Sequence, residues 1–99
     1  MEKAIERISE MEKCLNETNE IIASMAYALD KIEESKEDMT ALFRYYGSEE
    51  WYEDRDRKLP EGMPAGVLSE DLVYDAIIAL REEAIRMLEA ATDILKNRI

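Results

Sequence analysis

Apolar residues recur every seven positions along the first half of the chain. The two interleaved series are Ile8, Leu15, Ile22, Leu29, Lys36 and Phe43, and Met11, Thr18, Met25, Ile32, Met39 and Tyr46. This spacing is that of the a and d positions of a coiled-coil heptad. Because no glycine or proline precedes Gly47, the pattern predicts one helix over residues 3–46. Such a helix is roughly 66 Å long at 1.5 Å per residue.

Two polar residues interrupt the heptad pattern, Thr18 at a d position and Lys36 at an a position. Lys36 allows two interpretations. In a continuous helix its ammonium group reaches the surface, or fixes the register of the pairing. In the alternative, the helix breaks there and the chain forms a three-helix bundle. The heptad phase is the same on both sides of Lys36, which favours the continuous helix.

A second long helix is predicted over residues 69–97. Ser69 is a good N-cap, and Glu70 and Asp71 place negative charge in the first turn, where the helix dipole favours it. Leu68 can pack on Val73 as a hydrophobic staple. The apolar pattern of the helix consists of Val73, Leu80, Met87 and Ile94, accompanied by Ile77, Ala84, Leu88, Ala91 and Leu95. Its length is roughly 43 Å.

A connector joins the two long helices. Ser48 followed by Glu49 and Glu50 predicts a short helical piece over residues 49–54. Prolines and glycines then predict a loop over residues 55–68, with no regular structure before Ser69. The sequence therefore predicts a single all-α domain over residues 1–99. Its architecture is a long, antiparallel, coiled-coil-like helical hairpin with an ordered aromatic connector and a short middle helix.

The predicted long helices differ in length, and this difference favours self-association. In an antiparallel pair that starts at the connector, the second helix ends opposite about Glu17. The side chains left without an intramolecular partner are Ile5, Ile8, Met11 and Leu15. Burying one such side chain is worth roughly 1.5–3 kcal/mol, so four of them strongly favour association. We therefore expect a homodimer through the first helix, forming a helical bundle.

Several short stretches in and around the connector are distinctive: Tyr45-Tyr46 followed by Trp51, Leu59-Pro60, Gly66-Val67-Leu68-Ser69-Glu70-Asp71, and Tyr74. These stretches, together with the order of the helices, resemble a family of short bacterial all-helical proteins catalogued as domain of unknown function 4298. The resemblance covers most of the chain, and its most specific part is the stretch from Gly66 to Asp71. The resemblance implies that the connector is a defined structural element and not a simple linker. It implies no activity, because none is assigned to the family.

The connector region holds most of the aromatic residues and is the candidate functional site. Its residues are Tyr45, Tyr46, Trp51, Tyr52, Leu59, Val67, Leu68 and Tyr74. In one interpretation, Phe43, Tyr46, Trp51 and Tyr74 form a small core that caps the helix ends, with Leu59 and Val67 as lids. In the other, an exposed aromatic surface that includes Tyr45 and Tyr52 receives a peptide or a protein.

Charge narrows the possible partners. Thirteen basic and 24 acidic residues give a net charge of −11, which opposes binding to nucleic acid and to anionic membranes. No apolar run approaches the roughly 20 residues that span a bilayer, and the N-terminus has no apolar region typical of a signal peptide. The single Cys14 fits a reducing compartment. We therefore expect a cytoplasmic protein-interaction or scaffold module with an unidentified protein partner.

Catalytic chemistry has little support in the residues. The chain has no histidine, and no phosphate-binding loop or nucleophile motif. We expect no cofactor and no catalytic residue. The alternative is a magnesium-dependent nucleotide phosphohydrolase of the all-helical MazG type, whose metal would be held by helix carboxylates. The candidates are Glu82, Glu83, Glu89 and Asp93. Such spacings are also expected by chance, because about a quarter of the residues are acidic.

Overall fold

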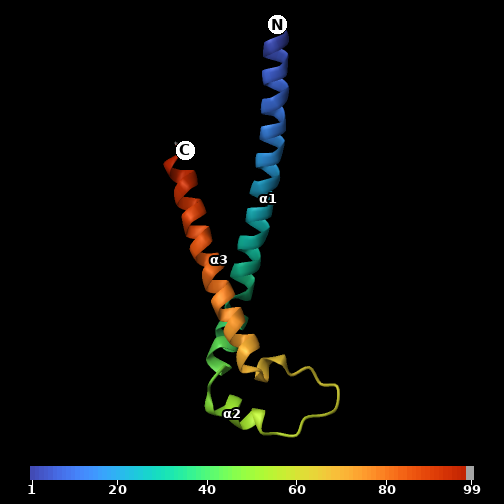
Figure 1. Cartoon of the computed structure of the whole chain (residues 1–99), viewed down its shortest axis with the longest axis vertical. Helices are drawn as coiled ribbons and strands as arrows, with labels where there is room; N and C mark the ends of the chain where they lie inside the picture. The colour runs from blue at the N-terminus through green and yellow to red at the C-terminus, as the bar shows by residue number, and fades with distance from the viewer. Residues whose placement is uncertain (98–99) are drawn as a thin grey trace. The chain divides into compact units, whose positions relative to one another are not determined.

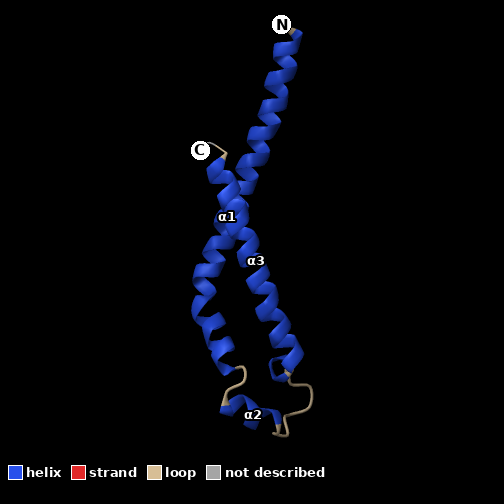
Figure 2. Ribbon diagram, turned by 60° about the vertical axis from the view of Figure 1, so that its left-hand side comes forward, coloured by secondary structure: helices blue, strands red, loops and turns tan. Residues whose placement is uncertain are grey.

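The computed structural model describes residues 1–97 and consists of helices joined by turns (Figure 1). In chain order they are α1 (Glu2–Tyr45), α2 (Glu49–Arg55), the 3₁₀ helix η1 (Gly66–Leu68) and α3 (Glu70–Lys96). No β-strand occurs among these residues (Figure 2). The predicted all-α class is confirmed. Two long helices joined by a connector with a short helix also give the element order of the predicted helical hairpin.

Helix α1 is a single α-helix of 44 residues that passes through Lys36 without a break. The Lys36 side chain is exposed, and its Nζ lies 3.4 Å from Glu33 Oε2 one turn earlier. Of the two interpretations of this position, the structure supports the continuous helix. Since α1 contains no glycine or proline, nothing in its sequence removes a backbone hydrogen bond within it.

A glycine and a serine end α1 and begin α2. Gly47 adopts a φ of +78°, the left-handed conformation that favours glycine after a helix. The next residue, Ser48, is the N-cap of α2, and its Oγ accepts a hydrogen bond from Trp51 N at 3.2 Å. Ser48 N also donates to Tyr45 O at 3.0 Å. These bonds satisfy backbone groups that a helix end leaves unpaired.

The start of α3 has the predicted cap, but the loop before it contains a helical turn that was not predicted. Ser69 Oγ accepts from Leu72 N at 3.3 Å. The expectation of no regular structure before Ser69 is wrong for η1. Leu68 N donates to Ala65 O and Ser69 N donates to Gly66 O, both at 3.0 Å. After Pro64 every residue again carries a backbone N–H, so the chain can close this turn.

The chain divides into two compact units, Met1–Met39 and Thr40–Ile99. The first unit is helical from Glu2 onward, and α1 has no buried residue. The second unit contains the two buried apolar residues found within residues 1–97, Trp51 and Val73. None of the helices described carries an apolar stretch of the length that crossing a bilayer requires. The prediction of a single domain over residues 1–99 stays a prediction.

Candidate interaction surface

Trp51 is the most deeply buried side chain of the described structure, with 2% of its surface exposed. The rings of Tyr46 and Tyr52 meet it edge-on, with centroids 5.0 and 4.9 Å away. Edge-to-face packing of this kind is the preferred geometry of aromatic pairs, because it brings a positive ring edge to a negative ring face. Trp51 is therefore the centre of a small aromatic core.

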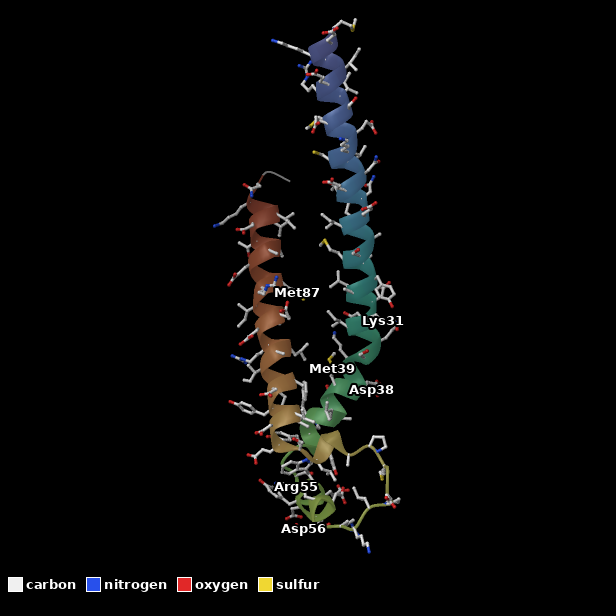
Figure 3. The ribbon with its side chains drawn as sticks, turned by 45° about the vertical axis from the view of Figure 1, so that its right-hand side comes forward. Lys31, Asp38, Met39, Arg55, Asp56 and Met87 are labelled. Carbon is white, nitrogen blue, oxygen red and sulfur yellow. The ribbon has the colours of Figure 1, made fainter. Side chains whose placement is uncertain are left out.

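A cation also contacts the indole ring. The guanidinium carbon of Arg55, which Figure 3 labels, lies 4.7 Å from the Trp51 ring centroid. Both residues belong to α2. Residues four apart on a helix lie on the same face, so this contact follows from the helical spacing. A guanidinium group over an indole face is attracted by the negative charge of that face. Arg55 thus helps to shield Trp51.

Two hydrogen bonds connect this core to the chain beyond the loop. Trp51 Nε1 donates to Val67 O at 3.0 Å, and Tyr46 Oη donates to Glu70 O at 3.2 Å. The first bond fixes α2 against η1, and the second fixes the end of α1 against the start of α3. Burial, followed by the negative charge of Glu70, raises the pKa of Tyr46. The connector is therefore an ordered element, closed at both ends.

A polar cluster forms around Asp54, three residues after Trp51 on α2. Tyr45 Oη donates to Asp54 Oδ2 at 2.6 Å, and Arg57 Nε donates to Asp54 Oδ1 at 3.2 Å. The hydrogen bond to the Asp54 carboxylate, together with burial and nearby negative charge, raises the pKa of Tyr45 to about 12. The phenol therefore keeps its proton at neutral pH and acts as a fixed donor. It has no property of a catalytic base.

An apolar hollow of about 270 Å³ borders this cluster. It is lined by Tyr45, Asp54, Arg57, Leu59, Met63, Pro64, Ala65, Val67 and Leu68. The volume suits one or two side chains rather than a large ligand, since pockets for drug-sized molecules span roughly 300–1,000 Å³. The hollow can therefore accept an apolar side chain beside the charged groups of Asp54 and Arg57.

The structure distributes the predicted site residues between a core and its surface. Trp51 is buried, whereas Tyr45, Tyr46, Leu59 and Leu68 are half-buried. The exposed members are Tyr52, Val67 and Tyr74. Of the Tyr74 surface, 54% is exposed. The contributions of Asp54, Arg55 and Arg57 were not foreseen from the sequence. Of these three, only the contact of Arg55 could have been predicted from the sequence, because Arg55 follows Trp51 by four residues.

The four candidate metal ligands all lie on α3. At roughly 100° per residue, Glu82, Glu89 and Asp93 share one side of the helix, and Glu83 lies about a quarter-turn or more away. Glu83 instead accepts two hydrogen bonds from Arg86 Nη1, at 2.8 and 2.9 Å. Within residues 1–97, no three acidic or cysteine side chains are placed to hold a metal ion. No contact in the described part of the chain favours the phosphohydrolase alternative.

The short sequence stretches of the connector and the order of the helices resemble one family, and a match to a family model decides whether the chain belongs to it. The model described as Domain of unknown function (DUF4298) matches residues 8–90. The chain belongs to this family. The match includes most of α1, the whole connector and α3 as far as Ala90, so the resemblance seen in the sequence is confirmed. No curated protein matches the chain. Membership of DUF4298 assigns no biochemical activity, in agreement with the sequence analysis.

Proposed function

We propose that this chain is a small protein-interaction or scaffold module of the bacterial cytoplasm that works as a coiled-coil homodimer and catalyses no reaction. The observation that carries this proposal is the exposed apolar stripe of α1. Its N-terminal members are Ile5, Ile8, Met11 and Leu15, each with more than half of its surface exposed. The stripe continues through Ile22, Met25 and Leu29, which are also exposed.

Helix lengths support a second copy as the partner of this stripe. Helix α1 has 44 residues and α3 has 27. Whatever its placement, α3 can accompany at most 27 residues of α1, which leaves 17 residues over. At 1.5 Å per residue this excess is about 26 Å long. The short α2 adds only seven residues. The same stripe on another copy has the matching period and length.

The energy of such a pairing indicates a dimer of moderate affinity. Burying the exposed half of one of these side chains contributes about 1 kcal/mol. The seven positions from Ile5 to Leu29 contribute in both copies, which gives about 14 kcal/mol. Lost translational and rotational freedom costs about 4–15 kcal/mol. The four N-terminal positions alone would contribute about 8 kcal/mol, which lies within the range of that cost, so we propose that the whole stripe takes part.

The dimer is tested by light scattering at micromolar concentration. The wild type should give a mass near twice 11.5 kDa. Ile8→Asp with Leu15→Asp places two charges on the stripe and should shift the mass towards that of the monomer. Ser9→Asp with Asn16→Asp adds the same charge about a quarter-turn away and should leave the dimer intact. A monomeric wild type across the accessible concentration range would overturn the proposal.

A further inference from the structure

Helix α3 carries two apolar faces. The heptad face consists of Val73, Ile77, Leu80, Met87 and Ile94. A second face, here named the Tyr74 face, consists of Tyr74, Ile78, Ile85, Leu88 and Leu95. At roughly 100° per residue, the centres of the two faces lie about 100° apart. One neighbouring helix covers a stripe about 100° wide, so the two faces require two separate occupants.

The Tyr74 face contains the most exposed aliphatic side chains of α3. Leu88 keeps 69% of its surface exposed and Leu95 keeps 70%. On the heptad face, the exposed fraction of Leu80 is 40% and that of Val73 is 5%. Contiguous apolar surface of this kind marks an interaction site more often than a solvated helix face. Arg81 also lies on the Tyr74 face, between Ile78 and Ile85.

A row of carboxylates follows one edge of the Tyr74 face. Its members, named the carboxylate row, are Asp71, Asp75, Glu82, Glu89 and Asp93. Their spacings of four and seven residues keep them on one side of the helix over its whole length. None of the five belongs to an ion pair within residues 1–97. Two cations lie near the row: Lys96 at its C-terminal end, and Arg86, which pairs with Glu83 and lies four residues from Glu82 and three from Glu89.

We propose that the Tyr74 face and the carboxylate row together bind a basic amphipathic helix of another protein. An apolar stripe with acids along one edge is complementary to a helix that has apolar anchors and lysines or arginines beside them. The surface runs from Tyr74 to Leu95, which is about 32 Å or six turns. This proposal rests on the interaction role proposed above, but it uses α3, whereas dimerisation uses α1.

Charge argues against a second copy as the occupant of this face. Two copies of α3 packed antiparallel about a two-fold axis place the same edge of each helix together. The carboxylate row would then face itself, and like charges across an interface are strongly unfavourable. A net charge of −11 on each copy adds to that repulsion. A basic helix removes both penalties and supplies partners for the unpaired carboxylates.

Binding is tested with a synthetic helix of about 21 residues, the length of six turns. The basic probe has leucine at heptad a and d positions and lysine beside them, and its matched control has glutamate in place of every lysine. Fluorescence anisotropy with the full-length chain should show binding of the basic probe alone, weakening as salt approaches about 1 M. Equal binding of both probes, or of neither, would overturn the proposal.

Variants locate the binding surface. Leu88→Ser with Leu95→Ser should weaken binding by about a hundredfold, because burial of each leucine contributes about a factor of ten. Asp75→Asn, Glu82→Gln and Glu89→Gln should also weaken it and flatten its salt dependence. The matched control removes three charges from α1 through Glu10→Gln, Glu17→Gln and Glu20→Gln. An equal loss in this control would mean general charge attraction and would refute the site.

Two further outcomes separate this proposal from the dimer. The Ile8→Asp, Leu15→Asp variant should lose the dimer but bind the basic probe as the wild type does. If the Leu88→Ser, Leu95→Ser variant instead loses the dimer in light scattering, the occupant of the Tyr74 face is a second copy, and the proposal fails. Circular dichroism of each variant, compared with the wild type, confirms that the helices are retained.

Discussion

Removal of the Trp51 side chain is the sharpest test of the connector. Truncating a buried tryptophan typically costs about 3–5 kcal/mol, and Trp51 is 2% exposed. A chain of this size has a total stability of roughly 5–15 kcal/mol. Trp51→Ala should therefore remove about a fifth or more of the free energy of unfolding.

A conservative substitution divides this cost into its parts. Trp51→Phe keeps much of the ring contact but loses the Nε1–H donor to Val67 O. An unpaired buried acceptor costs about 1–3 kcal/mol. Because Val67 is itself 38% exposed, water can reach its carbonyl, and we expect a loss of about 1 kcal/mol from the hydrogen bond. The remainder of the alanine effect then measures packing.

Urea unfolding followed by circular dichroism gives these free energies. Tyr52→Phe is the matched control: Tyr52 touches Trp51 but is exposed, so removing its hydroxyl should change stability by no more than about 0.5 kcal/mol. Wild-type fluorescence is a second readout, because Trp51 is the only tryptophan. We expect blue-shifted emission and weak acrylamide quenching. Emission like that of tryptophan in water, with a loss below about 1 kcal/mol in Trp51→Ala, would refute the aromatic core.

Three further predictions concern single positions. Lys36→Leu should raise the melting temperature of the dimer, because a charge on the apolar stripe of α1 is replaced by an apolar side chain and only an exposed ion pair with Glu33 is lost. Each kcal/mol gained in stability corresponds to about 4–8 °C. An unchanged melting temperature would show that Lys36 lies outside the helix–helix interface. Tyr45 has a pKa of about 12 in the folded protein, against 10.0 for the unperturbed phenol. Its contribution to the stability of the fold is therefore complete below pH 10 and is lost as pH rises through 12. The decline in stability over this interval should be smaller in Tyr45→Phe, measured by urea midpoints at a series of pH values, and an unchanged decline would contradict the role of the Asp54 bond. Ser69→Ala should lower stability by about 1 kcal/mol through loss of the cap, and Ser69→Gly by only a few tenths.

The sequence predicted the local features of the fold and missed the contacts that cross the loop. The roles of Gly47, Ser48 and Ser69 at helix ends could be predicted, because a helix end depends on backbone groups within three or four residues. The bond from Trp51 Nε1 to Val67 O joins residues 16 apart, and its existence depends on the path of the intervening loop. The same limit hid Asp54, which Tyr45 contacts only because α1 ends in a turn. Self-association and the identity of any partner stay predictions, because they depend on a second molecule.

The closed connector also has a consequence for folding kinetics. A helix gains its hydrogen bonds between near neighbours, and helix formation takes roughly a microsecond or less. The contacts of Trp51 with Val67 and of Tyr46 with Glu70 instead require closure of a chain segment of 16 and 24 residues, and such closure costs entropy before any contact repays it. The docking of the indole ring should therefore come after the growth of the 44-residue helix α1. The long helices would then form and melt many times before the connector closes and holds them in the native chain.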